Sequence, residues 1–251
     1  DTFLVSGRGE LHLAILIETM RREGYEMQVS QPEVILREEN DVTMEPYEHL
    51  SIDIPGDYQG VIMEELGARG AELLNVAPMG TTEIHMEYSI PTRGVIGLKT
   101  ELMTSTRGHV IMHHVFDQYK PVDGPITMGT PHGSLIAAVP GSSTGYALDN
   151  AQERGPLFIG PGIDVYMGMV IGQSARDQDL DINVCKSKNL TNMRAAGSDA
   201  AINLTPPKPV TLEYALEYIG PDELVEVTPT SIRLRKKILD ASHRKRPTRG
   251  V

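Results

Sequence analysis

Apolar side chains recur along residues 9–23 with the spacing of an α-helix. Four of them lie three or four residues apart and would share one helix face: Leu13, Leu16, Ile17 and Met20. Gly24 follows, and glycine commonly ends a helix. The sequence therefore predicts an amphipathic helix at residues 9–23, with short extended segments after it at 25–29 and 33–37.

Residues 50–116 change repeatedly between the two-residue period of a strand and the longer period of a helix. Predicted strands lie at 50–54, 71–76, 84–90 and 109–116. Predicted helices lie at 57–66, where Asp57 can cap the first turn, and at 94–106. This β-α-β-β-α-β order is the split-βαβ, or ferredoxin-like, plan. Its two helices cover one face of a four-stranded sheet, so the other face is free to dock a partner.

Prolines and glycines are frequent in residues 121–131, which we interpret as a linker. Beyond it, short strand-like runs lie at 134–139, 164–171, 181–185, 201–204 and 223–227. Two helices interrupt them, at 144–154 and at 212–219, the second with Thr211 as its cap. The pattern predicts an α+β chain whose last part is a mostly β, small-barrel-like domain with two helices.

Composition adds limits on the class of protein. The chain has 251 residues, of which 40% are hydrophobic and 23% charged, which is ordinary for a soluble globular protein. No run approaches the roughly 18 apolar residues of a membrane helix. The chain begins at Asp1 without an initiator Met or the features of a signal peptide, so we expect residues missing upstream. The single cysteine, Cys185, excludes an internal disulfide and a zinc-thiolate cluster.

Charge is unevenly distributed along the chain. The formal net charge is −11, yet residues 232–251 hold eight Lys or Arg and one Asp, a charge of +7 that leaves −18 on residues 1–231. A basic end on an acidic body can bind phosphate, although a solubilising disordered tail has the same composition. The cations that we assign to RNA binding here are Arg233, Arg235, Lys236 and Lys237.

A polar segment at residues 186–198 is the other candidate for RNA binding. It combines cations with hydroxyl and amide donors, which suit phosphate and ribose. Its candidate contact residues are Lys186, Lys188, Asn189, Thr191, Asn192, Arg194 and Ser198. Aromatic residues are lacking nearby, so we do not expect stacking on bases. An ordinary polar loop is the alternative interpretation.

Signals for catalysis are weak. A GTPase needs a Gly-rich loop ending in Gly-Lys-Ser/Thr, and no such loop occurs; the glycines at 94 and 97 are interpreted as allowing close packing at a helix start. Residues 141–145 match the Gly-x-Ser-x-Gly elbow of serine hydrolases, with Ser143 as nucleophile. Only His243 follows it, however, so a turn that caps the next helix is favoured. His113 and His114 would point to opposite faces of a strand, so we expect no metal site.

Several segments resemble one protein family in order along the chain. The most specific are Leu-Thr-Asn-Met-Arg at 190–194 and Asp-Glu-Leu-Val-Glu-Val-Thr-Pro at 222–229. Further matching segments lie at 6–13, 20–24, 32–38, 45–48, 58–60, 90–97, 152–155 and 157–160. Together they resemble the TypA/BipA translational GTPases, which are related to elongation factor G.

The resemblance implies three parts: residues 1–31 as the end of an elongation-factor-G-like domain III, 32–121 as the ferredoxin-like domain V, and 122–251 as the family-specific C-terminal domain with its basic tail. The domain that binds GTP and Mg²⁺ would lie outside this chain. We therefore expect no cofactor, no metal and no catalytic residue in it.

The same resemblance implies a monomeric, cytoplasmic, ribosome-binding fragment with a role in ribosome assembly and stress adaptation. It would dock at the A-site region and contact rRNA, A-site tRNA and ribosomal proteins of the stalk base, and no membrane. Two alternatives stay open at this point. One is a serine hydrolase centred on Ser143, and the other is a protein-interaction module that uses the open sheet face.

Overall fold

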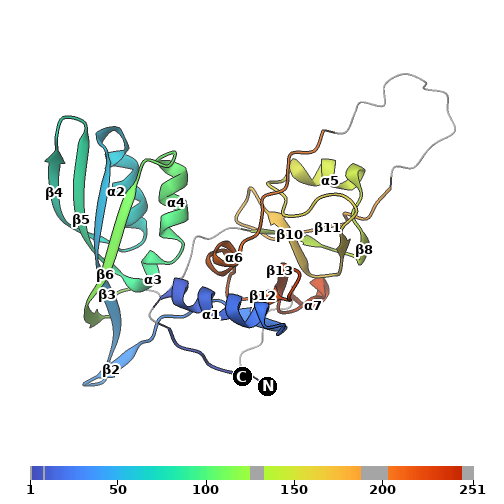
Figure 1. Cartoon of the computed structure of the whole chain (residues 1–251), viewed down its shortest axis with the longest axis horizontal. Helices are drawn as coiled ribbons and strands as arrows, with labels where there is room; N and C mark the ends of the chain where they lie inside the picture. Colours follow the sequence, from blue (N-terminus) through green and yellow to red (C-terminus); the bar gives the residue numbers. More distant parts are fainter. Residues whose placement is uncertain (1, 8, 125–132, 188–202, 245–251) are drawn as a thin grey trace. The chain divides into compact units, whose positions relative to one another are not determined.

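Leu50, Ile52 and Ile54 alternate along one long strand, β3 (Val42–Pro55), and all three are buried. This strand lies at the centre of an antiparallel sheet. Its strands are, in spatial order, β4 (Glu72–Met79), β5 (Glu83–Pro91), β3 and β6 (Ile111–Pro121). A short strand, β2 (Arg37–Glu39), pairs with the beginning of β3. The computed structural model describes residues 2–7, 9–124, 133–187 and 203–244, and this sheet belongs to a unit formed by residues 32–130 (Figure 1).

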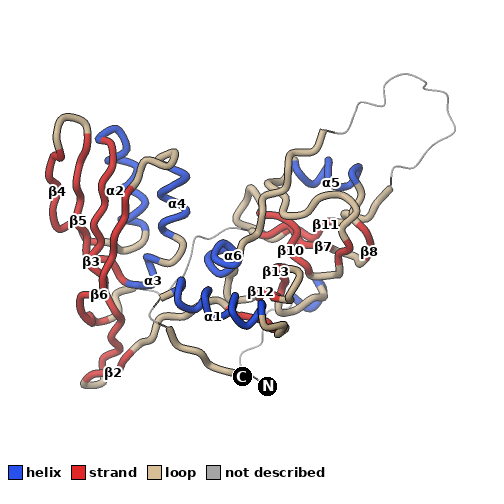
Figure 2. The backbone as a smooth tube through the Cα atoms, viewed as in Figure 1, coloured by secondary structure: helices blue, strands red, loops and turns tan. Residues whose placement is uncertain are grey.

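Helices of this unit lie together on one side of the sheet, as Figure 2 shows. A 3-10 turn, η1 (Gly56–Tyr58), leads into α2 (Gln59–Ala68), and α3 (Thr92–Val95) and α4 (Leu98–Ser105) follow β5. The helices bury Ile62, Leu66, Leu98 and Leu102 against the alternating side chains of the sheet. The ferredoxin-like architecture is thus confirmed.

The helix predicted at residues 94–106 is divided into two. Gly97 adopts a φ of 71°, a left-handed conformation that glycine tolerates and that separates α3 from α4. Gly94 lies where chain segments approach closely, because a Cβ there would be 2.8 Å from the carbonyl oxygen of Arg69. The guanidinium of Arg69 donates at 2.9 Å to the carbonyls of Gly94 and Ile96. The prediction of close packing is therefore confirmed for Gly94, whereas Gly97 provides the left-handed turn between the two helices.

The second unit comprises residues 1–31 together with 131–251. Its main sheet has six strands in the order β1 (Met27–Ser30), β12 (Glu223–Val227), β13 (Ile232–Lys236), β10 (Met169–Gln173), β7 (Ser134–Ala137) and β11 (Leu180–Ile182). Only β11 and β7 are parallel neighbours. A separate pair is formed by β8 (Gly141–Ser142) and β9 (Asp164–Val165). Within the described residues these strands form an open sheet and not a closed barrel.

Both faces of the six-stranded sheet carry helices. On one face, α1 (Glu10–Arg22) and α6 (Leu212–Tyr218) pack against Val225, Val227 and Leu234. On the other, α5 (Gly145–Gln152) packs against Leu135, Ala137 and Ile171. A short helix, α7 (Ala241–Arg244), follows β13. The two predicted helices of this region are confirmed, and Thr211 caps α6 by accepting from the Tyr214 N–H at 3.2 Å.

Residues 1–31 join this unit through long-range contacts that the sequence did not reveal. Strand β1 pairs along its whole length with β12. Ala14 and Ile17 of α1 enter the same core as α6, and the guanidinium of Arg21 donates to the Pro229 carbonyl at 2.8 Å. The division into three parts by family origin stays a prediction, while the structure describes two units.

Some predicted boundaries differ from the structure. Residues 33–36 precede β2 as coil, and Asn203 and Leu204 form no strand. The strand at 232–236 was missed because its cations were interpreted as part of a tail.

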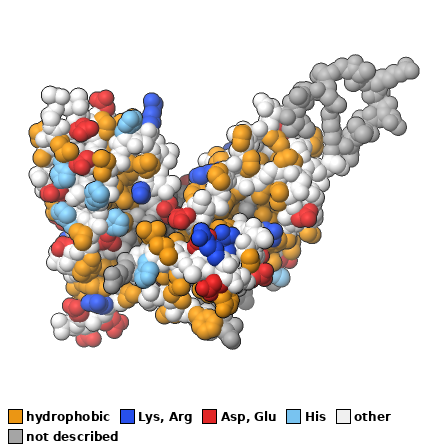
Figure 3. All heavy atoms as spheres, in the orientation of Figure 1, with side chains coloured by type: hydrophobic (Ala, Val, Ile, Leu, Met, Phe, Trp, Pro, Cys, Tyr) orange, Lys and Arg blue, Asp and Glu red, His pale blue; other side chains and the backbone are white. Residues whose placement is uncertain are grey.

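No helix in the described parts of the chain is long and apolar enough to cross a membrane. Histidines gather in the other unit: five of the eight lie in residues 32–130, and Figure 3 shows such side chains on it.

Candidate nucleic-acid interface

Arg233 and Arg235 point to the same side of β13. Residues in a strand alternate between faces, and Leu234 between them is buried in the core formed with α1 and α6. The two arginines therefore lie on the opposite face, and both are half-buried. Their cross-strand partners on β12 are Glu226 and Leu224.

That face is the one covered by α5 farther along the sheet. The hydroxyl of Tyr166 donates to the carboxylate of Glu226, which is the direct partner of Arg233. Tyr166 itself packs on the core formed with α5. Burial first, and then the Glu226 carboxylate, raise the pKa of Tyr166, so the phenol remains a donor. The arginine pair and α5 thus share one face.

Helix α5 also holds the described start of the candidate RNA segment. Thr144 caps α5, and its hydroxyl donates to the carbonyl of Lys186 at 2.5 Å while its backbone N–H donates to the Val184 carbonyl at 2.9 Å. Lys186 and Ser187 are exposed. The carbonyl of Lys186 is thereby fixed while its side chain faces solvent.

The other end of the segment is held by the last residue of the same helix. The amide of Gln152 donates to the Asn203 carbonyl at 3.0 Å and accepts from the Thr205 N–H at 3.0 Å. An eight-residue helix is about 12 Å long. The residues on either side of 187–202 are therefore fastened to opposite ends of one short helix, α5.

Six of the seven residues predicted in this segment lie outside the described residues: Lys188, Asn189, Thr191, Asn192, Arg194 and Ser198. Their RNA-binding role stays a prediction. Thr144 and Gln152 were not recognised as residues that fasten the segment. The only sequence signal for Thr144 was the capping turn before the predicted helix.

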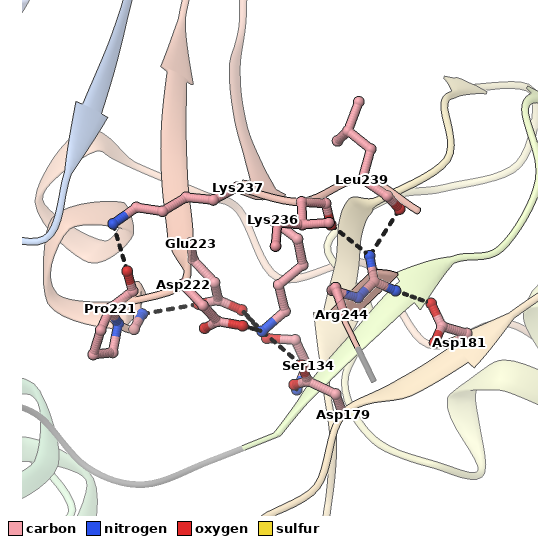
Figure 4. A network of polar contacts seen from close by, with 12 residues as sticks. Ser134, Asp179, Asp181, Pro221, Asp222, Glu223, Lys236, Lys237, Leu239 and Arg244 are labelled. Atoms are coloured by element: carbon pink, nitrogen blue, oxygen red, sulfur yellow. Dashed lines mark hydrogen bonds and ion pairs between the residues drawn. The ribbon is translucent and has the colours of Figure 1, made fainter. Parts of the chain in front are cut away.

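Lys236 does not belong to the exposed cations. Its side chain follows the alternation of Ile232 and Leu234 into the interior, and the residue is 3% exposed. Its ammonium lies 2.6 Å from Asp179, 2.9 Å from Glu223 and 3.0 Å from Asp222 (Figure 4). Burial acts to lower the pKa of Lys236, but the carboxylates, Glu223 foremost, outweigh it and raise the pKa. We correct its assignment: this lysine is a counter-ion of the buried Glu223 and also pairs with the more exposed Asp179 and Asp222.

The two other cations of this segment that the structure describes after Lys236 have different roles. Lys237 is exposed, with its ammonium 2.5 Å from the Pro221 carbonyl (Figure 4). Arg244 is paired with Asp181 and donates to the carbonyls of Ile238 and Leu239 at 3.0 and 2.8 Å. Arg244 therefore anchors the chain after β13, whereas Lys237 remains near the surface.

Ser143 has the contacts of a structural turn. It is 4% exposed, its hydroxyl donates to the Gly160 carbonyl at 2.8 Å, and the same oxygen accepts from the Ile163 N–H at 3.0 Å. Among the described contacts no histidine bonds to it. Within the described residues these contacts include no general base of the kind a serine hydrolase needs, and they favour the interpretation as a turn before a capped helix. Within the described residues, no three His, Cys, Asp or Glu side chains lie together as ligands for a metal ion.

Comparisons with known proteins agree along the whole chain. The sequence model of the TypA/BipA C-terminal domain matches residues 132–241, and that of the elongation factor G C-terminus matches residues 42–128. A protein of Bacillus subtilis (strain 168), named large ribosomal subunit assembly factor BipA, is 45% identical over 98% of this chain. Proteins of the same name from Synechocystis and Salmonella typhimurium are 50% and 46% identical over 94% and 100% of it. The chain spans 40%, 39% and 41% of these three relatives.

Proposed function

Because this chain belongs to the TypA/BipA family, we propose that it is the ribosome-binding C-terminal portion of a translational GTPase that takes part in assembling the large ribosomal subunit. The assembly role comes from the name that its relatives carry. Binding and hydrolysis of GTP with Mg²⁺ belong, in this proposal, to sequence beyond these residues. The chain itself acts by binding, in the cytoplasm and as a monomer.

The observation that carries the proposal is a shared cationic face. Arg233 and Arg235 lie on the side of the sheet that α5 covers, and α5 fastens the exposed Lys186 at its capped end. From β13 to β11 the sheet spans three strand spacings, about 14 Å. Cations held at such separations by a sheet and a helix are able to contact separate phosphates of folded RNA.

The finer assignments follow from the family resemblance. The unit containing α5 and β13 contacts rRNA and the acceptor end of A-site tRNA, and residues 32–130 rest near the stalk base beside ribosomal proteins. The cellular role includes adaptation to stress. Phosphate contacts release counterions, so binding through this face should weaken steeply as salt increases.

The arginine pair can be tested by sedimentation with large ribosomal subunits. We expect R233A/R235A to weaken co-sedimentation by about tenfold or more, because hydrogen bonds to charged groups contribute about 1.5–3 kcal/mol each. The slope of log affinity against log salt should decrease by about 2. A matched double variant, R22A/K99A, removes the same charge from α1 and α4 and should change neither quantity much. Equal losses in both variants would reduce the effect to net charge and contradict the assignment.

The predicted segment needs a variant of its own. Replacing Lys186, Lys188 and Arg194 with alanine should weaken co-sedimentation and lower the salt slope by about 3, one for each lost phosphate contact. A triple variant that pellets as well as the parent protein shows that the segment does not contact RNA. The arginine pair and this segment can therefore fail independently.

A further inference from the structure

The sheet of residues 32–130 has a second face that the helices of its own unit leave open (Figure 2). The strand register arranges this face in three rows across β4, β5, β3 and β6. The rows are Ala77, His85, Asp53 and Ile111; Asn75, Glu87, Ser51 and His113; and Glu72, Ser89, His49 and Val115. Each row contains one histidine, and each carries a carboxylate.

Charge on this unit differs sharply from the rest of the chain. Residues 32–130 hold sixteen Asp or Glu and six Lys or Arg, a formal charge of −10 out of the total of −11. On the open face, Asp53, Glu87 and Glu72 point away from the core. One cation, Lys120, reaches the third row, where its ammonium donates to the Ser89 hydroxyl at 2.9 Å. The three carboxylates outnumber it, so the face repels RNA phosphate and attracts cations. Its charge is therefore opposite to that of Arg233 and Arg235 in the other unit.

Histidine and carboxylate side chains are interleaved on the two central strands. His85 lies 2.5 Å from Asp53 and 3.5 Å from Glu87, and Glu87 lies 3.9 Å from His49. The residue of β4 that pairs with His85 is Ala77, which carries no charge. On β5 itself, Glu83 is a second acid besides Glu87 on the same face as His85. The hydrogen bond to Asp53 raises the pKa of His85 despite some burial. Because these histidines adjoin the carboxylates, their protonation offsets the negative charge of the face.

An apolar margin runs along β6 at the edge of the same face. Ile111 is 59% exposed and Val115 is 62% exposed. A partner with cationic and aliphatic side chains matches this combination of carboxylates beside an apolar edge, since each kind of surface meets its complement. A polyanion such as RNA complements neither the carboxylates nor the apolar edge.

We propose that the open sheet face of residues 32–130 docks a Lys/Arg-rich segment of a protein, and that protonation of its histidines releases that segment. The inference is independent of RNA binding by the other unit. It selects the protein-interaction alternative for this unit and states the chemistry of the partner.

The test measures fluorescence anisotropy of a labelled oligolysine peptide with the full chain. We expect D53N/E87Q to weaken peptide binding by about tenfold, because it removes the two central carboxylates. The matched variant D57N/E64Q removes the same charge from the helix side and should weaken binding by less than about twofold. Circular dichroism melts confirm that each variant is folded. Equal weakening by the two variants means that only net charge attracts the peptide and overturns the proposal.

Two further arms address protonation and RNA. Binding should weaken several-fold as the pH falls from about 7.5 to about 5.5, and H49Q/H85Q/H113Q should remove that dependence while still binding at the higher pH. A pH dependence unchanged in the triple variant refutes the histidine mechanism. An RNA oligonucleotide should not displace the peptide, and displacement that persists in the R233A/R235A background would show that this face binds RNA instead.

Discussion

Replacing Lys236 with methionine is expected to destabilise the unit that contains the six-stranded sheet by about 3–5 kcal/mol, because it leaves a buried carboxylate without its counter-charge. Glu223 is 3% exposed, and apart from the ammonium it accepts from the Ser134 hydroxyl at 2.6 Å and the Gly220 N–H at 2.9 Å. Those neutral donors do not offset a full charge. Denaturant unfolding followed by circular dichroism measures the loss, and hydrogen exchange locates it in this unit.

The neighbouring residue provides the control for this variant. Lys237 is exposed, so K237M should cost less than about 0.5–1 kcal/mol although it removes the same charge. Adding E223Q to K236M should recover part of the loss, since the uncompensated charge disappears. If K236M is no less stable than K237M, Lys236 is not the buried counter-ion described here.

Arg93→Ala is expected to destabilise residues 32–130 by a comparable 3–5 kcal/mol. The guanidinium donates to the two carboxylate oxygens of Glu45 at 2.7 and 3.2 Å, and Glu45 is fully buried. It also donates to the Asp123 carbonyl at 2.9 Å, so it fastens the end of the unit. For a unit of this size the melting temperature should fall by more than about 10 °C, measurable by calorimetry.

Arg93→Lys distinguishes geometry from charge in this pair. A lysine keeps the positive charge but cannot form the two-pronged contact with Glu45, so it should recover only part of the loss. Lys99 is exposed on α4, and K99A should change the melting temperature by no more than a few degrees. Hydrogen exchange should show the loss within residues 32–124 and leave β12 and β13 protected. A loss confined to the other unit would contradict the assignment.

Local patterns predicted the ferredoxin-like unit well, because its strands each have one buried face. Strand β3 is predicted by the alternation of Leu50, Ile52 and Ile54 alone. The order of the elements along the chain then leaves few possible topologies. The break at Gly97 was missed, since a single glycine in a helical pattern does not reveal its φ angle. In the other unit, short strands and coil alternate too quickly for their pairing to be inferred.

The candidate interface was predicted only in part. Arg233, Arg235 and Lys236 have similar side chains, and charge alone grouped them. These three cations belong to the five-residue run Ile232–Lys236, in which apolar and charged residues alternate as in a strand, and that pattern would have separated the lysine from the two arginines. Charge obscured it. Membership of residues 1–31 in the C-terminal unit had no local signal, because β1 pairs with a strand about two hundred residues away.

From the sequence alone, family membership, most helices and most strands followed, since all three depend on which residues stand near one another along the chain. The acidic character of residues 32–130 is likewise a matter of composition. Only the tertiary structure decided which cations face solvent and which face carboxylates. That outcome depends on the pairing of β12, β13 and β7, which brings Glu223, Lys236 and Ser134 together. It also depends on α5, whose two ends hold residues far apart in sequence.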